Sequence, residues 1–166
     1  MKLVREHINE IKLENILKPV PQKEVLDKIK HFSQEEKDKK LMAASKDGNI
    51  KVVELLLQTG ADINAKDDGG FTALMRASSN GHRDVVELLL QAGAEVDAKT
   101  NNGGTALMWA SSWASSNGHI DVVKLLLQAG AEVDTKTNYG WTALMWASSN
   151  GHRDVVELLK QYGATE

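Results

Sequence analysis

Three histidines recur in the same short context, and histidine is the residue best suited to acid–base chemistry and metal binding near neutral pH. His82, His119 and His152 each follow an Asn-Gly pair. If they hold equivalent positions in helices stacked side by side, about 8 to 10 Å separates them, too far to share one ion at about 2 Å. We therefore predict that each imidazole holds the inter-helix turn of its own unit, and that the chain binds no metal.

Other residues offer weaker signs of chemistry. Serine pairs such as Ser78–Ser79 lack a nearby base with an orienting acid, which a hydroxyl nucleophile needs. The pairs Gly69–Gly70 and Gly103–Gly104 are not followed by the Lys-Ser/Thr of a phosphate-binding loop. The chain has no cysteine, which excludes thiolate nucleophiles and disulfides. The sequence therefore predicts no catalytic residue, no cofactor and no enzyme.

The histidines belong to a unit that recurs along the chain. Thr72 and Thr105 are 33 residues apart, a period typical of repeat proteins. In the last three units the sequence predicts a Gly/Asn/Asp-rich turn, a threonine N-cap, a short helix stopped by glycine, and a second helix on "DVVELL" or "DVVKLL". The first unit has Lys39 and Lys40 in place of Thr-Ala and no such turn before it. The predicted repeats span about 33–66, 67–99, 100–136 and 137–166.

The third repeat is longer because "LMWASSWASSNGH" contains Trp-Ala-Ser-Ser twice, so Thr105 and Thr142 are 37 residues apart. Four residues add about 6 Å to a helix and nearly preserve its face. The duplication therefore either lengthens the first helix of this repeat or loops out before Asn117. In both cases we expect Trp113 to be an exposed aromatic residue on the binding side.

Residues 1–32 lie outside the period and form the first predicted domain, ahead of the repeats at 33–166. Apolar spacing predicts two amphipathic helices separated by "KPVP", and "SQEE" from Ser33 is a capping box that begins the first repeat. We expect the N-terminal helices to cap the exposed edge of the stack. The alternative is that they form an independent docking element.

The repeat "DDGGFTALMRASSNGHRDVVELLLQAGAEVDAK" resembles an ankyrin repeat, and the resemblance extends over about 34–166. The chain departs from the common Thr-Pro-Leu-His pattern by reading Thr-Ala-Leu-Met from Thr72, Thr105 and Thr142. The resemblance implies an all-α solenoid, in which turn tips and first helices line a concave groove that binds proteins. This implication is by analogy, because a fold alone does not fix a function.

Aromatic residues mark the candidate contact surface, and all four tryptophans fall in the third and fourth repeats. Trp141 and Tyr139 lie at a predicted turn tip, where we expect binding, while Trp109 and Trp146 on the first helices could bind or pack. The candidate partner-binding residues are Asp68, Phe71, Arg76, Asn101, Asn102, Trp109, Trp113, Asn138, Tyr139, Trp141 and Trp146.

Composition and charge reduce the number of function classes that the sequence supports. The net charge of −3 gives no reason to expect binding to nucleic acid or to an anionic membrane. The charged N-terminus lacks the apolar core of a signal peptide or a membrane span, which predicts a cytoplasmic protein, with export as an effector left open. We predict a non-enzymatic module that binds a protein partner as a monomer. The alternative is a self-assembling scaffold, natural or engineered, that pairs two copies into a homodimer.

Overall fold

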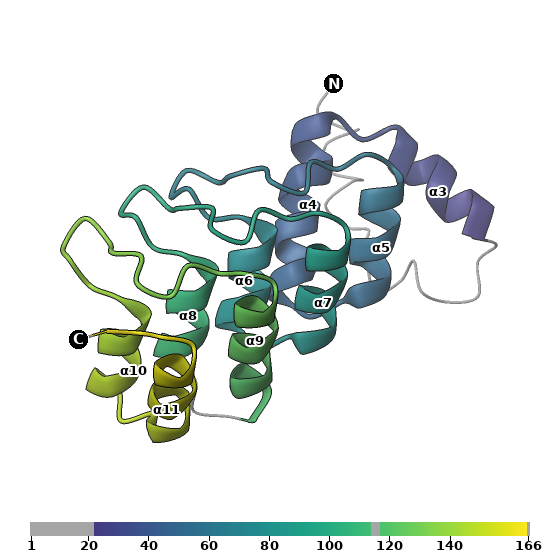
Figure 1. Cartoon of the computed structure of the whole chain (residues 1–166). Helices are drawn as coiled ribbons and strands as arrows, with labels where there is room; N and C mark the ends of the chain where they lie inside the picture. Colours follow the sequence, from purple (N-terminus) through teal and green to yellow (C-terminus); the bar gives the residue numbers. More distant parts are fainter. Residues whose placement is uncertain (1–21, 114–116, 166) are drawn as a thin grey trace.

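The computed structural model describes residues 22–113 and 117–165, and these residues form helices stacked in two rows (Figure 1). Helix α3 (Gln22–Lys30) precedes the stack. The first helices of the four repeats form one row: α4 (Gln34–Lys46), α6 (Ala73–Ser79), α8 (Ala106–Ser112) and α10 (Ala143–Ser149). The second helices form the other: α5 (Ile50–Gln58), α7 (Arg83–Gln91), α9 (Asn117–Gln128) and α11 (Arg153–Gln161). The predicted all-α repeat architecture is confirmed.

Local side-chain chemistry sets where the first helices begin. The hydroxyl of Thr105 accepts a hydrogen bond from the Met108 backbone N–H at 3.5 Å, and Thr72 and Thr142 cap α6 and α10 in the same way. In α4, Ser33 and Glu36 form the predicted capping box. These N-cap predictions are confirmed.

Replacing Thr105 by alanine is expected to lower the free energy of unfolding by about 1 to 2 kcal/mol. Thr105 is buried, so the change removes a cap and leaves the orphaned amide of Met108 without water to replace the hydroxyl. Urea denaturation measures the effect. Thr105→Ser keeps the hydroxyl and should recover most of the loss; equal destabilisation by both variants would contradict a capping role.

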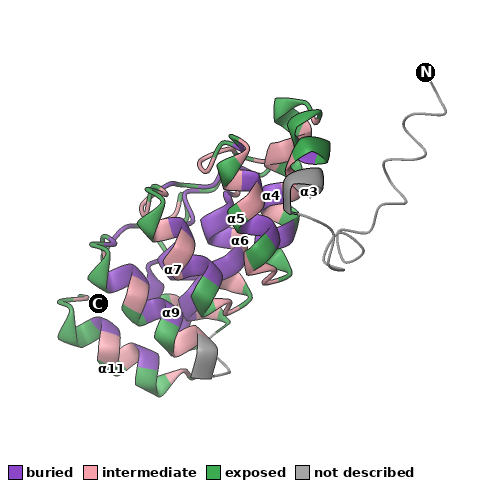
Figure 2. Ribbon diagram, turned by 90° about the vertical axis from the view of Figure 1, so that its right-hand side faces the viewer, coloured by how far each residue is buried: buried purple, intermediate pink, exposed green. Residues whose placement is uncertain are grey.

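The core lies where the repeats face one another, and Figure 2 shows buried residues concentrated between neighbouring helices. On α8, Leu107 and Ala110 are buried, as the apolar stripe of the first helix predicts. On α9, Val122, Val123 and Leu126 are all fully buried. A lone amphipathic helix could not bury this many residues, so the second helices depend on the neighbouring repeats for stability.

The histidines connect successive repeats, which corrects the prediction that each holds the turn of its own repeat. His82 Nε2 lies 2.7 Å from the Lys46 carbonyl oxygen, and His119 Nε2 lies 3.0 Å from that of Ser79. His152 Nε2 similarly lies 3.2 Å from the carbonyl oxygen of Ser112. Because carbonyls only accept, Nε2 donates in each case. The imidazole thus satisfies the end of the preceding repeat's first helix, where carbonyls have no partner within the helix.

The duplicated sequence does not lengthen the first helix of the third repeat. Helix α8 has 7 residues, as α6 and α10 do, and it ends at Ser112. A longer α8 would project beyond both neighbours and leave its extra apolar turn uncovered. Helix α9 begins at Asn117, so the prediction of an Asn-Gly-His turn at this position is wrong. Trp113 is the C-cap of α8, and residues 114–116 are outside the described part of the chain.

Helix α3 contacts the first repeat through its last turn and the residues that follow. Ile29 is buried in the core, and Lys40 Nζ lies 4.8 Å from the centroid of the Phe32 ring. Lys37 Nζ donates to the Thr59 carbonyl oxygen at 3.0 Å, which joins α4 to the end of α5. The division at residue 32 and the capping role of the N-terminal segment stay predictions, and the first predicted helix lies outside the described residues.

Candidate functional site

Each turn tip is held by one side chain at its start. The Thr100 hydroxyl accepts from the Gly104 backbone N–H at 3.0 Å, and the Thr137 hydroxyl accepts from that of Trp141 at 3.1 Å. Asp67 performs this role in the second repeat through its carboxylate. Phe71, Gly104 and Trp141 each precede an N-cap threonine, and these local hydrogen bonds hold the backbone of each in place at the turn tip.

Neighbouring tips are joined by asparagine side chains. Asn101 Nδ2 donates to the Asp68 carbonyl oxygen at 2.8 Å, and Asn138 Nδ2 donates to that of Asn101 at 3.1 Å. Asp68, Asn101 and Asn138 are exposed, yet both asparagine amides already have partners within the fold. Contact of Asp68, Asn101 and Asn138 with a partner stays a prediction. In the fold, the two asparagine side chains hold neighbouring turn tips together.

Phe71, Arg76 and Trp109 form one stack between the second and third repeats. The Arg76 guanidinium lies 4.1 Å from the Phe71 ring centroid and also pairs with the Asp67 carboxylate. The Phe71 and Trp109 ring centroids are 5.1 Å apart. Trp109 Nε1 is buried, and among the described residues it has no hydrogen-bond partner. Arg76 and Phe71 are therefore largely committed to packing against this tip.

The ionised carboxylate of Asp67 helps to stabilise the turn tip of the second repeat. Partial burial raises the pKa of Asp67, but hydrogen bonds from Arg76 and from the Phe71 and Gly69 amides lower it by more, so the pKa lies below its usual range. The carboxylate therefore contributes stability that is fully present above its unfolded pKa of about 3.9 and is lost as pH falls through the lower folded value.

The variant Asp67→Asn is expected to lose about 1 kcal/mol of stability at pH 7, because the pair with Arg76 is partly exposed. The stability difference between the wild type and the variant should shrink as pH falls from about 3.9 through the lower folded pKa, because the carboxylate is protonated first in the unfolded and then in the folded chain. Urea denaturation between pH 7 and 2.5 measures both. A difference that does not change with pH would contradict this role.

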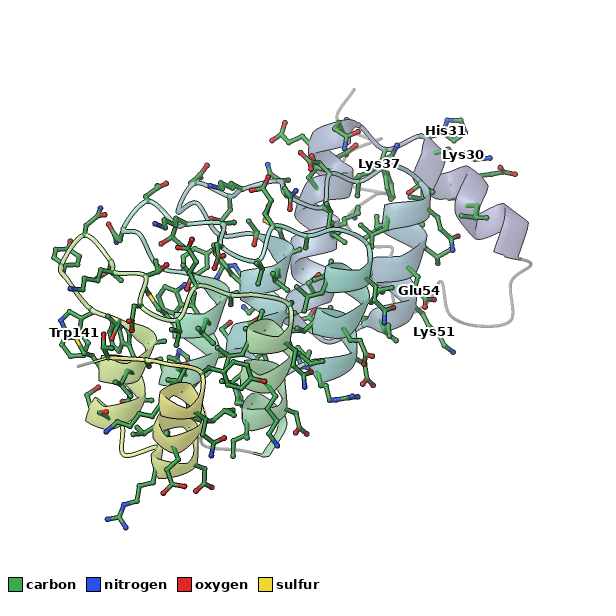
Figure 3. The ribbon with its side chains drawn as sticks, in the orientation of Figure 1. Lys30, His31, Lys37, Lys51, Glu54 and Trp141 are labelled. Atoms are coloured by element: carbon green, nitrogen blue, oxygen red, sulfur yellow. The ribbon has the colours of Figure 1, made fainter. Side chains whose placement is uncertain are left out.

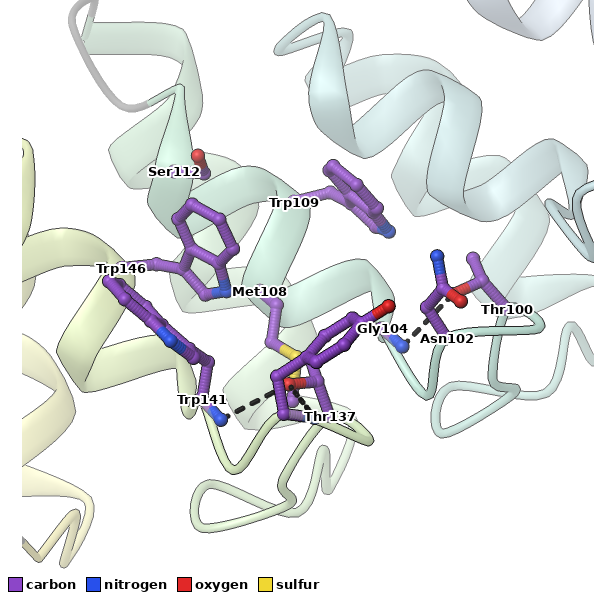
Figure 4. Close-up of a pocket in the computed structure, with 10 residues that line it drawn as sticks. Thr100, Asn102, Gly104, Met108, Trp109, Ser112, Thr137, Trp141 and Trp146 are labelled. Atoms are coloured by element: carbon purple, nitrogen blue, oxygen red, sulfur yellow. Dashed lines mark hydrogen bonds between the residues drawn. The ribbon is translucent and has the colours of Figure 1, made fainter.

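A cavity of about 380 Å³ opens between the third and fourth repeats (Figure 4). The Trp141 and Trp146 ring centroids are 4.7 Å apart on one side of it, and Trp109 faces them from the other. None of the described residues that line it is charged. The lining residues are Thr100, Asn102, Gly104, Met108, Trp109, Ser112, Thr137, Tyr139, Trp141 and Trp146.

Gly104 lines the cavity at a position where two other repeats carry an aromatic residue. It shares its register with Phe71 and Trp141, so the third repeat alone among these three lacks an aromatic side chain before its N-cap threonine. A Cβ on Gly104 would lie 3.2 Å from both Thr100 Oγ1 and Trp109 Nε1. Gly103, in contrast, has a φ of 80°, which favours glycine for conformational reasons. Gly104 therefore lets Thr100 and the Trp109 ring approach the backbone closely, and Gly103 provides the turn.

The structure brings together five of the predicted site residues in this aromatic pocket: Asn102, Trp109, Tyr139, Trp141 and Trp146. Trp113 is 60% exposed at the end of α8 but does not line the pocket. Trp109 and Trp146 also pack against the core, and a binding role for them stays a prediction. Sequence analysis missed several lining residues, and for Gly104 the signal was the missing aromatic in the repeat register.

The aromatic pocket lies toward the C-terminal end of the stack. Figure 3 shows Trp141 beside α10, far from Lys37 and the other labelled N-terminal residues. Tyr139 is the most exposed of its aromatic residues, with 77% of its surface accessible. Among the described residues no three His, Asp or Glu side chains are grouped to hold a metal ion.

Comparison with known proteins identifies the class. The family model for ankyrin repeats, which describes three copies, matches residues 15–100, 41–137 and 95–165. The chain therefore belongs to the ankyrin repeat family, and the resemblance seen in its sequence is confirmed. None of the curated proteins compared with it gives a significant match. Ankyrin repeats generally mediate protein–protein interactions.

The comparisons add no enzyme family to the ankyrin match. In the part of the chain that the structure describes, every helix is too short or too polar to cross a bilayer.

Proposed function

We propose that the protein is a non-enzymatic interaction module that binds a protein partner through its turn tips and the face of its first helices. The observation that carries the proposal is the aromatic pocket, an uncharged hollow with Tyr139 and Trp141 exposed at a turn tip. Tryptophan and tyrosine dominate binding energy at protein interfaces because they bury a large area at low entropic cost. An exposed apolar surface of this kind costs solubility unless a partner uses it.

The pocket chemistry indicates the class of partner segment. With no charge in its lining, the pocket favours a bulky aliphatic or aromatic side chain over a charged one, whose desolvation no lining residue would offset. Polar groups such as Asn102 and Thr137 lie among the lining residues, where they can orient the backbone of the partner. The turn tips are held by their own hydrogen bonds, so the site is largely formed before binding.

A random peptide library displayed on phage tests this function without a known partner. The library is selected against the immobilised full-length chain, the double variant Trp141→Ala/Trp146→Ala, and Trp113→Ala as a matched control outside the pocket. Thermal melting first shows that all three are folded. We expect wild type and Trp113→Ala to retain the same peptides, each with a bulky apolar residue, and the double variant to lose them.

Two outcomes would contradict the proposal. If the double variant retains the same peptides, binding does not use the pocket. If the wild type selects no peptides and sedimentation equilibrium shows a dimer that the double variant cannot form, the tryptophans serve self-assembly, and the scaffold alternative replaces the interaction module.

A further inference from the structure

The hydrogen-bond acceptors that line the aromatic pocket are mostly occupied within the fold. The Thr100 and Thr137 carbonyl oxygens each accept from a backbone N–H of their own turn tip at 2.9 Å. The hydroxyl oxygens of the same two threonines accept from the tips as well. The lining residues whose carbonyl oxygens already have a donor are Thr100, Asn102, Gly104, Ser112, Thr137, Trp141 and Trp146. A partner therefore finds few free acceptors here.

The donors of the pocket, in contrast, include ring groups that the fold does not use. Among the described residues, the indole N–H of Trp141, the indole N–H of Trp146 and the Tyr139 hydroxyl have no hydrogen-bond partner. An indole N–H can only donate. Figure 4 shows the ring nitrogen of Trp146 on the edge that faces Met108, which also lines the pocket. Trp109 differs, because its Nε1 is buried, so this ring offers a partner its face.

This excess of donors discriminates between the backbone conformations of a partner segment. An extended strand brings N–H groups that would be buried without an acceptor, which costs free energy. An α-helix satisfies its own carbonyls and would leave the indole N–H groups unpaired. A proline-rich segment in the polyproline II conformation presents free carbonyl oxygens, and its prolines carry no N–H. Its conformation is also largely formed before binding, which lowers the entropic cost.

The spacing of the tryptophans fits the same conformation. Trp109 and Trp146 hold the same register on α8 and α10, and neighbouring helices are about 8 to 10 Å apart. In polyproline II, three residues advance the chain by about 9 Å and return to the same face. Each tryptophan also packs on a second ring, Trp109 on Phe71 and Trp146 on Trp141, so both are held in place.

We propose that the aromatic pocket binds a proline-rich segment of the partner in the polyproline II conformation. Two prolines three residues apart lie on Trp109 and Trp146, and carbonyl oxygens of the segment accept from the indole N–H groups of Trp141 and Trp146. The uncharged lining suits the apolar pyrrolidine rings. This inference rests on the proposed function, which it narrows to one class of partner segment.

Fluorescence polarisation with labelled decaproline, which adopts polyproline II, tests the inference on the full-length chain. The control peptide has the same length, with two leucines three residues apart in a glycine–serine background. Trp146→Phe removes an accessible N–H and part of a ring. Trp109→Phe removes the same ring area but a buried N–H, so it is the matched variant, and Trp113→Ala lies outside the pocket. Thermal melting first shows that each variant is folded.

We expect decaproline to bind the wild type with a Kd below about 1 mM, and the leucine peptide to bind at least about tenfold more weakly. Trp146→Phe should weaken decaproline binding about three- to tenfold more than Trp109→Phe, because it alone loses a hydrogen bond to the peptide. Trp113→Ala should leave the affinity unchanged. If Trp146→Phe does not fold, the comparison of the two peptides on the wild type still decides.

Three outcomes would overturn the inference. If the leucine peptide binds the wild type at least as tightly as decaproline, and Trp141→Ala/Trp146→Ala abolishes that binding, the segment class is wrong but the interaction module stands. If decaproline binds the wild type and this double variant equally, it does not use the pocket. If decaproline does not bind and the phage library also selects no peptide, the proposed function fails together with the inference.

Discussion

Gly104→Phe is expected to weaken the binding of a pocket-selected peptide by about 30-fold or more, which corresponds to roughly 2 kcal/mol. The substitution places a ring where the second and fourth repeats carry Phe71 and Trp141, and this ring fills the aromatic pocket. Gly104 has no left-handed φ, so a side chain is compatible with its backbone. Fluorescence polarisation with a labelled peptide measures the affinity.

A matched control shows whether Gly104→Phe weakens binding by filling the pocket or by distorting the fold. The new Cβ would press on Thr100 Oγ1 and Trp109 Nε1 by a few tenths of an ångström, so a modest change in melting temperature is expected. Gly104→Ala introduces the same contact without filling the pocket and is the matched control. Equal binding losses in the two variants would show that distortion, and not occupancy of the pocket, causes the effect.

Leu126→Ala is expected to lower the free energy of unfolding by about 3 to 5 kcal/mol, the largest stability change among these predictions. Leu126 is fully buried on α9, in the third of the four repeats. Its removal leaves a cavity that neighbouring repeats on both sides resist closing. Because stability in a solenoid is a sum over repeats and interfaces, damage to an internal repeat weakens two interfaces at once.

The adjacent Leu125→Ala is the control for this effect. Leu125 is only partly buried and should cost less than about half as much. Guanidinium denaturation followed by circular dichroism measures both variants. Similar losses at the two positions would contradict the assignment of Leu126 to the interface between repeats.

The features that could be predicted from sequence are those determined within one repeat. The threonine N-caps and the Ser33 capping box depend on residues three positions apart, so the local pattern was enough. The 33-residue period predicted stacking, since one repeat cannot cover its own apolar residues. The ankyrin family model matches the part of the chain that carries these motifs.

The features that sequence analysis missed depend on the neighbouring repeat. The acceptor of His119 is the Ser79 carbonyl oxygen, 40 residues away, which no local spacing indicates. Trp109, which lines the pocket, stacks on Phe71 of the preceding repeat and lies close to the backbone of Gly104. For the duplicated Trp-Ala-Ser-Ser, helix geometry allowed both outcomes, and in the structure α8 has the same length as α6 and α10.

The indole N–H signals of the four tryptophans provide the most direct test that the aromatic pocket is the partner site. Each signal is assigned in a two-dimensional NMR spectrum by a Trp→Phe variant, and a pocket-selected peptide is then titrated into the full-length protein. We predict that the signals of Trp109, Trp141 and Trp146 shift to saturation with one affinity, while that of Trp113 stays in place. A shift confined to Trp113, or binding that moves none of the pocket signals, would contradict the account.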